Sequence, residues 1–595
     1  MKLAAVLLFA AALAGCATLS VRPAAMTLEE KVGQLFVYVT PGSFMNEGSP
    51  RYRELLRQVR ENHVGGILWA TWSSVFESAF LIRRLQSVAK VPLLVSADLE
   101  AGIGMRFYDT TYWPWPMAVA ATGDPDLARR EGEIVAEEAR AIGLNQVYAP
   151  VADVNVNPDN PVINVRSFGE DPQEVARFVA AFVRGVESRG VIATVKHFPG
   201  HGDTRTDSHR SLPVLSVSRE RLERVELVPF RAAIAAGAGA IMTAHLSLPA
   251  LDDEPAPVRP GGVAENPYAH DAVEVAQNAT LPASLSSKIT GGLLRGELGF
   301  RGLVVTDALD MGGIVDHFDP GEAAVRAILA GADQVVKSTD TDAAIAGVQR
   351  AVQAGRITRD RLDLSVGRIL AAKARAGDLE PDWNRIFSVV DSPEHRAVVE
   401  EIARRSVTLV RESPGVLPLG RKTRVFQLVV AETERGLGGD LNKELKSRLE
   451  GPAEMAVLDS RSSAAEVARV LEGASRAEVV LLALFVRFQS GKGSIVLPAA
   501  AKEVVERLPA PVRVVAVSFG SPYVLRELPN LETYLCAWGS QTDMQVAAAR
   551  ALFGEAPITG RLPVTIPDLA PRGTGIQKGT GERGDRGTGR GRQTQ

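Results

Sequence analysis

The sequence predicts an α/β protein in which a (β/α)₈ barrel is followed by a second, smaller α/β domain. Between Thr27 and about Ala376, short apolar runs alternate with amphipathic helical stretches. Eight such runs over about 350 residues suit a barrel of parallel strands. The runs are almost continuously apolar, as expected for strands covered on both faces. The predicted strands are Gln34–Val39, Val64–Ala70, Pro92–Ala97, Gln146–Val151, Val191–Val195, Ala240–Ala244, Gly302–Thr306 and Gln334–Lys337.

Helices are expected between most of these strands. The first opens at Thr27 with a capping-box pattern that includes Glu30; the first strand could instead continue this helix. An insertion rich in Pro, Asp and Glu, Leu251–Thr280, follows the sixth strand and is predicted to be a rim loop. Further predicted helices are Asp126–Ile142, Pro172–Ser188, Arg219–Ala236 and Glu322–Ala330.

A second alternation of strands and helices over residues 399–570 predicts an open, doubly wound sheet. Residues 379–398, with Pro381 and Trp383, are expected to link it to the barrel domain, residues 16–378. Residues 571–595 are rich in Gly, Arg and Thr and are predicted to be disordered. The predicted strands are Val425–Ala431, Val479–Val486, Val512–Phe519 and Thr533–Ala537, and the predicted helices are Lys443–Leu449, Ala464–Leu471, Ala500–Leu508 and Met544–Leu552.

The composition is that of a globular protein with more than one core. The chain has 595 residues, of which 46% are hydrophobic and 23% charged. A formal net charge of −3 gives no reason to expect nucleic acid as a partner. The composition leaves the oligomeric state open. Of two cysteines, Cys536 lies in an apolar run and is predicted to be a small buried hydrophobic residue.

The N-terminus has the pattern of a secretory signal over residues 1–15. Lys2 precedes an apolar stretch, Leu3–Leu13, which is too short to span a bilayer as a helix. The Leu-Ala-Gly-Cys motif that ends at Cys16 resembles the bacterial lipobox, in which the cysteine is lipidated. An ordinary cleaved signal is the alternative. Because Ala17 follows the cysteine where an aspartate would favour retention in the inner membrane, we expect a lipid anchor in the outer membrane, facing the periplasm, and no other membrane contact.

The segment KHFPGHGDTRTDSH, residues 196–209, concentrates polar groups on a loop that follows the fifth predicted strand. Pro199, Gly200 and Gly202 oppose a regular helix. In this loop Asp207 and His209 are two residues apart, so the carboxylate can accept one imidazole N–H and fix the tautomer. Such a histidine can act as general acid and base near neutral pH.

A metal site is the alternative interpretation of this loop. His197 and His201 have the spacing of two zinc ligands on a helix. Pro199 and Gly200 lie between them and oppose that helix, although a zinc site built from all three histidines on the loop stays possible. We expect neither a metal nor an organic cofactor.

Asp307 follows the seventh predicted strand and is therefore expected to point into the mouth of the barrel. It is the natural partner of the Asp207–His209 dyad; the alternative is a helix N-cap. Asp310, three residues later, is predicted to be a helix-start or surface residue.

Other polar motifs follow the third and fourth strands. Asp98 and Glu100 close the third strand, with Arg106 eight residues after Asp98, and Arg166 lies after the fourth strand in an Asn-Val-Arg-Ser-Phe-Gly motif. Aspartate, arginine, lysine and histidine side chains at these strand ends can make charge-assisted hydrogen bonds to a ligand dense in hydroxyl groups. Singly, each could instead form a loop salt bridge.

The motifs Asp-Leu-Glu, Arg-Ser-Phe-Gly, KHFPGHGDTRTDSH and Thr-Asp-Ala-Leu-Asp-Met occur here in the order found in glycoside hydrolase family three. They resemble its β-N-acetylglucosaminidase branch, and the resemblance covers most of residues 27–376. Segments 405–410 and 560–565 resemble the second domain of that family. The resemblance implies a barrel followed by an αβα sandwich. This sequence departs from the branch at Ala101 and Ile103, where a glycine and an arginine are usual. Asp98 and Arg106 keep their usual spacing.

Carried over residue by residue, the resemblance implies His209 as acid/base, Asp207 as its assistant and Asp307 as nucleophile. It implies sugar contacts by Asp98, Arg106, Arg166, Lys196 and His197. The expected activity is a retaining exo-β-N-acetylglucosaminidase acting on cell-wall muropeptides or chitin-type oligosaccharides. The alternatives are a β-glucosidase or xylosidase of the same family, an N-acetylglucosaminide phosphorylase, and a non-catalytic lipoprotein that binds peptidoglycan fragments.

Overall fold

The computed structural model describes residues 22–40, 42–268, 279–377, 380–431, 436–486 and 495–581. The predicted signal peptide, residues 1–15, and Cys16 lie outside them. The chain forms two compact units, which divide near Val398 and Val399. Among the described residues, no helix combines the length and apolarity needed to cross a bilayer.

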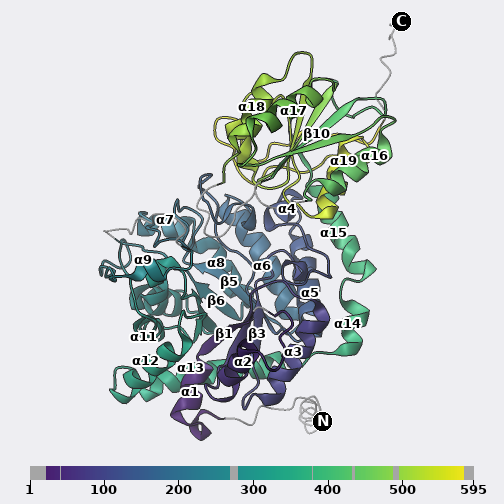
Figure 1. The fold of residues 1–595 in the computed structure, drawn as a ribbon. Coiled ribbons are helices and arrows are strands. Elements are labelled where there is room, and N and C mark those ends of the chain that lie inside the picture. Colours follow the sequence, from purple (N-terminus) through teal and green to yellow (C-terminus); the bar gives the residue numbers. More distant parts are fainter. Residues whose placement is uncertain are drawn as a thin grey trace, which may run out of the picture. The chain divides into compact units, whose positions relative to one another are not determined.

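The first unit contains a closed barrel of eight parallel strands in chain order (Figure 1). β8 pairs with β1, with Val335 opposite Phe36, and this pairing closes the barrel. All eight predicted strands are present, although Gln34 still belongs to the opening helix and the fourth strand already ends at Val147. The first strand does not continue the opening helix. The strands are β1 (Phe36–Thr40), β2 (Gly66–Trp69), β3 (Leu94–Ala97), β4 (Gln146–Val147), β5 (Ile192–Phe198), β6 (Ala240–Thr243), β7 (Leu303–Ala308) and β8 (Gln334–Val336).

The predicted helices of this region are present, with one correction. The capping box of α1 forms between Thr27 and Glu30. The single helix predicted over Arg219–Ala236 is wrong, because the chain leaves helical geometry at Val225 and a new helix starts at Leu227. Pro229 is tolerated in the first turn of that new helix, whereas inside a longer helix it would remove a backbone hydrogen bond.

The described helices of the first part of the chain are α1 (Leu28–Gln34), α2 (Pro50–Arg60), α3 (Val75–Val88), α4 (Pro116–Ala121), α5 (Pro125–Ile142), α6 (Pro172–Ser188), α7 (Arg219–Arg224), α8 (Leu227–Ala235), α9 (Gly262–Glu265), α10 (Gly312–Val315), α11 (Pro320–Ala330), α12 (Thr341–Gln353), α13 (Arg359–Ala376), α14 (Trp383–Val389) and α15 (Pro393–Ser406). Short 3₁₀ segments are η1 (Pro23–Ala25), η2 (Ile103–Met105), η3 (Asn164–Arg166) and η4 (Ala283–Leu285), and η5 (Ser287–Glu297) is π-helical.

Two segments between strands and units contain more structure than we predicted. The insertion Leu251–Thr280 contains α9 and a bridge between Pro255 and Thr280, and is therefore not loop throughout; residues 269–278 lie outside the described residues. The segment 379–398, predicted as a linker, contains α14 and the start of α15.

The second unit is built around a six-stranded sheet with the order β11-β10-β12-β13-β14-β9. The four predicted strands form its parallel centre. We missed the two outer strands, of which β9 is antiparallel and β11 is largely exposed, so neither gives a long apolar run. The elements are β9 (Thr408–Arg411), β10 (Val425–Ala431), β11 (Glu454–Leu458), β12 (Val479–Phe485), β13 (Arg513–Ser518), β14 (Thr533–Cys536), α16 (Gly439–Arg448), α17 (Ala464–Ala474), α18 (Ala499–Arg507), α19 (Thr542–Leu552) and the 3₁₀ segment η6 (Pro522–Glu527).

The prediction of disorder is wrong for residues 571–581. The backbone N–H of Ile576 donates to the carbonyl of Leu409 at 2.8 Å, and Lys578 forms an antiparallel bridge with Ile558. Backbone hydrogen bonds thus order a segment whose composition offers few apolar side chains. Residues 582–595 lie outside the described residues. Cys536 is fully buried in β14, as predicted.

Candidate active site

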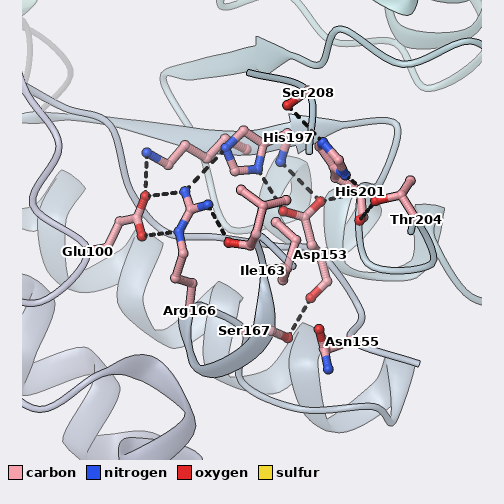
Figure 2. Close-up of polar contacts among 12 residues, drawn as sticks. Glu100, Asp153, Asn155, Ile163, Arg166, Ser167, His197, His201, Thr204 and Ser208 are labelled. Carbon is pink, nitrogen blue, oxygen red and sulfur yellow. Dashed lines mark hydrogen bonds and ion pairs between the residues drawn. The ribbon is translucent and has the colours of Figure 1, made fainter. Parts of the chain in front are cut away.

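A cluster of five charged side chains forms where β3, β4 and β5 end. Asp98 and Glu100 follow β3, and Lys196 in β5 joins them, because its Nζ donates to Asp98 Oδ1 at 2.7 Å and lies 2.6 Å from Glu100 Oε1. Arg106 Nη2 donates to Asp98 Oδ2 at 2.8 Å. Arg166 in η3 donates to both oxygens of Glu100, each at 2.7 Å (Figure 2). Sequence analysis placed four of these five at the site and missed the role of Glu100.

The two carboxylates of this cluster are ionised, although Glu100 is buried and the Asp98 side chain is only 26% exposed. Burial raises the pKa of Asp98, but the charges of Lys196 and Arg106 lower it more, and the net pKa lies well below its ordinary value. Burial likewise raises the pKa of Glu100, but Arg166 and Lys196 bring it down to about 2. The cluster therefore presents fixed charges in a buried place, where charge-assisted hydrogen bonds are strong.

The replacements at Ala101 and Ile103 lie inside the loop that carries Arg106. Both side chains are fully buried. The backbone N–H of Arg106 donates to the carbonyl of Ile103 at 2.9 Å, within a 3₁₀ turn. The contact between Asp98 and Arg106 is thus made in a loop whose interior is apolar.

His197 is oriented by a buried aspartate that sequence analysis did not identify. Its Nδ1 lies 2.7 Å from Asp153 Oδ2 (Figure 2). Asp153 Oδ1 also accepts from the backbone N–H of His201 at 2.6 Å. Because Nδ1 faces a carboxylate, Nε2 is the ring nitrogen left to face a ligand; it lies 3.5 Å from Arg166 Nη2. The only sequence signal for Asp153 was its position soon after an apolar strand.

His201 is buried and bound on both ring nitrogens. Nδ1 lies 2.7 Å from Thr204 Oγ1, and Nε2 lies 3.1 Å from Ser208 Oγ. Burial lowers the pKa of this imidazole to about 4. His201 therefore braces the loop as a neutral side chain. Within the part of the chain that the structure describes, no group of three or more His, Cys, Asp or Glu residues could hold a metal ion.

Asp207 and His209 form a hydrogen-bonded dyad. His209 Nδ1 lies 2.7 Å from Asp207 Oδ1, and the same oxygen accepts from the backbone N–H of His209 at 2.9 Å. The Asp207 side chain is fully buried, whereas that of His209 is 20% exposed. The ring of Tyr268 packs edge-on against His209, with centroids 5.0 Å apart. The dyad therefore holds one imidazole nitrogen and leaves the other accessible.

The dyad loop is tied by its backbone to the segment that follows β7, about a hundred residues later. Gly312 N donates to the carbonyl of His209 at 2.9 Å, and Gly313 N donates to the carbonyl of Ser208 at 3.1 Å. A Cβ added to Gly312 would lie 2.4 Å from the Arg210 carbonyl oxygen, so the close approach requires glycine there. These bonds bring the loop that carries His209 against the segment that follows Asp307.

Asp307 lies in β7 and accepts the backbone N–H of Ala308 at 2.8 Å. Burial raises its pKa, but three nearby imidazoles and this N–H lower it more, so the net pKa lies below its ordinary value. The imidazoles belong to His197, His245 and His209. His209 of the dyad is thus one of the groups that lower the pKa of Asp307.

Two neighbours of Asp307 differ from the prediction. Asp310 is neither a helix-start nor a surface residue: it is buried and lies 2.8 Å from Lys337 Nζ, and Met311 is the N-cap of α10. His245, which sequence analysis missed, lies just beyond β6. Its Nε2 contacts the Ala308 carbonyl at 2.9 Å and its Nδ1 contacts Ser284 Oγ at 2.8 Å. It thereby holds the peptide that follows Asp307.

A closed barrel with charged side chains and hydrogen-bonded histidines gathered after its strands is the arrangement of a barrel enzyme. Residues 27–372 match the family described as "Glycosyl hydrolase family 3 N terminal domain". The chain belongs to this family and is a glycoside hydrolase.

Three relatives are similar to this chain over more than 90% of its length. A Cellulomonas fimi protein named "Beta-N-acetylglucosaminidase/beta-glucosidase" is 34% identical over 561 residues, which are 91% of this chain and 94% of that protein. A family 3 β-N-acetylglucosaminidase from Paenibacillus sp. str. FPU-7 superimposes with a TM-score of 0.77 at 33% identity, covering 91% and 99% of the two chains. The β-glucoside phosphorylase BglX bound to 2FGlc superimposes with a TM-score of 0.79 at 28% identity, covering 92% and 95%.

Proposed function

We propose that this enzyme is a retaining exo-β-N-acetylglucosaminidase that removes terminal N-acetylglucosamine from cell-wall muropeptides or chitin-type oligosaccharides. The observation that carries the proposal is the junction of two loops. Backbone bonds from Gly312 and Gly313 hold the His209 loop against the segment after Asp307. A sugar between these loops would meet a carboxylate and an imidazole.

In the first step, Asp307 attacks the anomeric carbon and the bond to the leaving oxygen breaks. His209 protonates that oxygen from Nε2, while Asp207 holds the Nδ1 side of the ring. The lowered pKa of Asp307 keeps the nucleophile ionised at neutral pH. The product of this step is a covalent glycosyl-enzyme and a free aglycone.

In the second step, His209 takes a proton from water and the resulting hydroxide attacks the anomeric carbon. The bond to Asp307 breaks, and the sugar leaves with its original configuration. The histidine takes the acid and base roles that a second carboxylate has in most retaining enzymes.

The charged cluster supports the exo-acting part of the proposal. Asp98, Lys196 and Arg166 offer charged donors and acceptors to the hydroxyl groups of a terminal sugar, and the side chains of Lys196 and Arg166 are buried. His197, held by Asp153, adds a further donor or acceptor. We expect this cluster to hold the terminal sugar and to block a chain that continues past those hydroxyl groups.

The substrate class is tested by comparing aryl β-glycosides of N-acetylglucosamine, glucose and xylose at equal concentration. The N-acetylglucosaminide should have the largest kcat/KM, and proton NMR of the first product should show the β-anomer. A larger kcat/KM for the glucoside or the xyloside would refute the substrate assignment, and an initial α-anomer would refute retention. Muropeptides and chitobiose then separate the two natural substrate classes.

Phosphorolysis is the second candidate, favoured by the similarity to BglX. An imidazole in the acid/base role carries no negative charge to repel phosphate, whereas a carboxylate in that role would. Reactions run with and without inorganic phosphate distinguish the two. Free sugar as the sole product in both supports hydrolysis, whereas sugar 1-phosphate in the phosphate reaction supports the phosphorylase. Turnover should persist in a chelator, because no step of the proposal uses a metal.

We also propose that Cys16 carries a lipid that anchors the enzyme to the outer membrane, facing the periplasm. The support is the lipobox-like motif that ends at Cys16. Labelling of the wild-type chain with a fatty-acid analogue and loss of the label in Cys16→Ser would support it. An unlabelled, soluble wild-type protein would contradict it.

A further inference from the structure

Aromatic side chains gather in one exposed patch on the outside of the barrel unit, where α3 and α14 lie beside each other (Figure 1). Phe80 of α3 packs on Trp383 of α14, with ring centroids 4.8 Å apart. Phe76 lies 5.3 Å from Phe387 and 6.5 Å from Trp383, and the planes of Phe76 and Trp383 are within 4° of parallel. Four rings from two helices thus form one surface.

Burial of the helices does not explain these rings. In α14 only Ile386 is buried, while Trp383 and Phe387, four residues apart, lie on one face of the helix. A single exposed aromatic residue is ordinary, but a contiguous group marks a binding surface. The exposed fractions are 39% for Phe76, 64% for Phe80 and 78% for Phe387.

Two further exposed aromatic residues relate the patch to the candidate active site. Trp72 is 58% exposed and precedes Phe76 by four positions, and Tyr108 is 60% exposed. Trp72 Nε1 donates to the carbonyl of Met105 at 2.7 Å. Ser73 N donates to the carbonyl of Arg106 at 3.0 Å. Trp72 is therefore attached to the loop that brings Arg106 to Asp98.

We propose that this aromatic patch, formed by Phe76, Phe80, Trp383 and Phe387, binds an extended polysaccharide of N-acetylglucosamine units, with Trp72 and Tyr108 as further exposed rings on the side of Arg106. The flat faces of pyranose rings carry C–H groups, which pack favourably on the electron-rich faces of aromatic rings. The proposal goes beyond the proposed activity and takes from it only the sugar chemistry. Polymer held at the patch would keep chain ends near the barrel mouth.

The charges around the patch favour a neutral glycan over a lipid surface. Along the two helices the rings are flanked by Glu77, Arg83, Arg84 and Arg385, so both signs are present. Arg385 is paired with Glu137 at 2.5 Å, and Arg84 donates to the Tyr52 hydroxyl at 3.3 Å. An anionic bilayer surface selects clusters of basic residues, and these flanking side chains form no such cluster.

The test is a depletion isotherm of the full chain on insoluble chitin, with excess N-acetylglucosamine present to occupy the active site. The variant is Phe80→Ala combined with Phe387→Ala, and the matched control is Leu364→Ala, an apolar helical residue of α13 that is 51% exposed. We expect the double variant to lose about tenfold or more in affinity for chitin, and the control to stay within about twofold. The same proteins are tested on vesicles of anionic phospholipid.

Activity on a soluble aryl N-acetylglucosaminide should stay within about twofold of wild type in both variants, because neither touches the sugar pocket. Unchanged chitin affinity in the double variant, or a wild type that does not bind chitin, would overturn the proposal. Loss of vesicle binding alone would assign the patch to a membrane instead. If the wild type binds chitin but does not hydrolyse the aryl N-acetylglucosaminide, the proposed function is wrong, whereas the proposal that the patch binds polysaccharide still stands.

Discussion

The two halves of the candidate site differ in how their charges are balanced. In the cluster around Asp98 and Glu100, each carboxylate meets arginine or lysine at 2.6–2.8 Å. Asp307 has one peptide N–H and the more distant effect of three imidazoles. A carboxylate saturated by cations is a poor nucleophile but a rigid anchor, whereas one held by weaker partners keeps its reactivity. The comparison agrees with the proposal that the cluster binds the sugar and Asp307 reacts with it.

Removing the weakly held carboxylate should have the largest effect. Asp307→Ala should lower kcat on an aryl N-acetylglucosaminide by about 10⁴-fold or more, because no other group can form the covalent intermediate. Steady-state kinetics and thermal unfolding check this together. The control is Asp319→Asn, which removes an N-cap carboxylate of α11 and should leave kcat nearly unchanged. Appreciable activity in Asp307→Ala would end the nucleophile assignment.

The second test contrasts two histidines of the same loop. His209→Ala should cost about 10²–10⁴ in kcat/KM for substrates with poor leaving groups and far less for activated aryl glycosides, since only the former need a proton. His201→Ala leaves Thr204 and Ser208 without their imidazole partner. It should therefore lower the melting temperature, and it should reduce kcat/KM by the same factor for both kinds of substrate. Equal losses in His209→Ala would argue against its role as acid.

The third test measures how the stability contributed by the Glu100 carboxylate, one of the cation-paired carboxylates, depends on pH. The pKa of Glu100 falls from 4.5 to about 2 on folding, so its ionised form stabilises the native state above the unfolded pKa, and this stabilisation is lost as pH falls toward 2. The contribution is about 3 kcal/mol at neutral pH by linkage. Urea unfolding of wild type and Glu100→Gln should therefore differ most near pH 7 and converge toward pH 2–3. A difference independent of pH would show that Glu100 is not the titrating group.

The smallest effect on kcat/KM is expected for Tyr268, whose ring packs against His209 of the dyad. Tyr268→Phe keeps the ring that packs on His209 and removes only the hydroxyl, which lies 3.3 Å from Lys337 Nζ. The loss in kcat/KM should stay below about tenfold, the range of one hydrogen bond. A larger loss would mean that the hydroxyl itself contacts the reacting sugar.

Sequence reasoning succeeded where local pattern decides the outcome. The eight apolar runs located every barrel strand, and the Asp-x-His spacing at Asp207 and His209 located the dyad, because a short loop fixes both contacts. It failed for Asp153, Glu100 and His245, whose partners lie 44, 66 and 63 positions away along the chain. It also misjudged Asp310, because its partner Lys337 follows a different strand.

The sequence by itself determined the alternation of strands and helices, the family to which the chain belongs, and the chemical types gathered after each strand. Only the tertiary structure decided which charge neutralises which, that His201 is a neutral brace, and that residues 571–581 are ordered by backbone bonds. The physical reason is that periodicity and spacing are local along the chain, whereas burial and charge pairing depend on segments brought together by barrel closure.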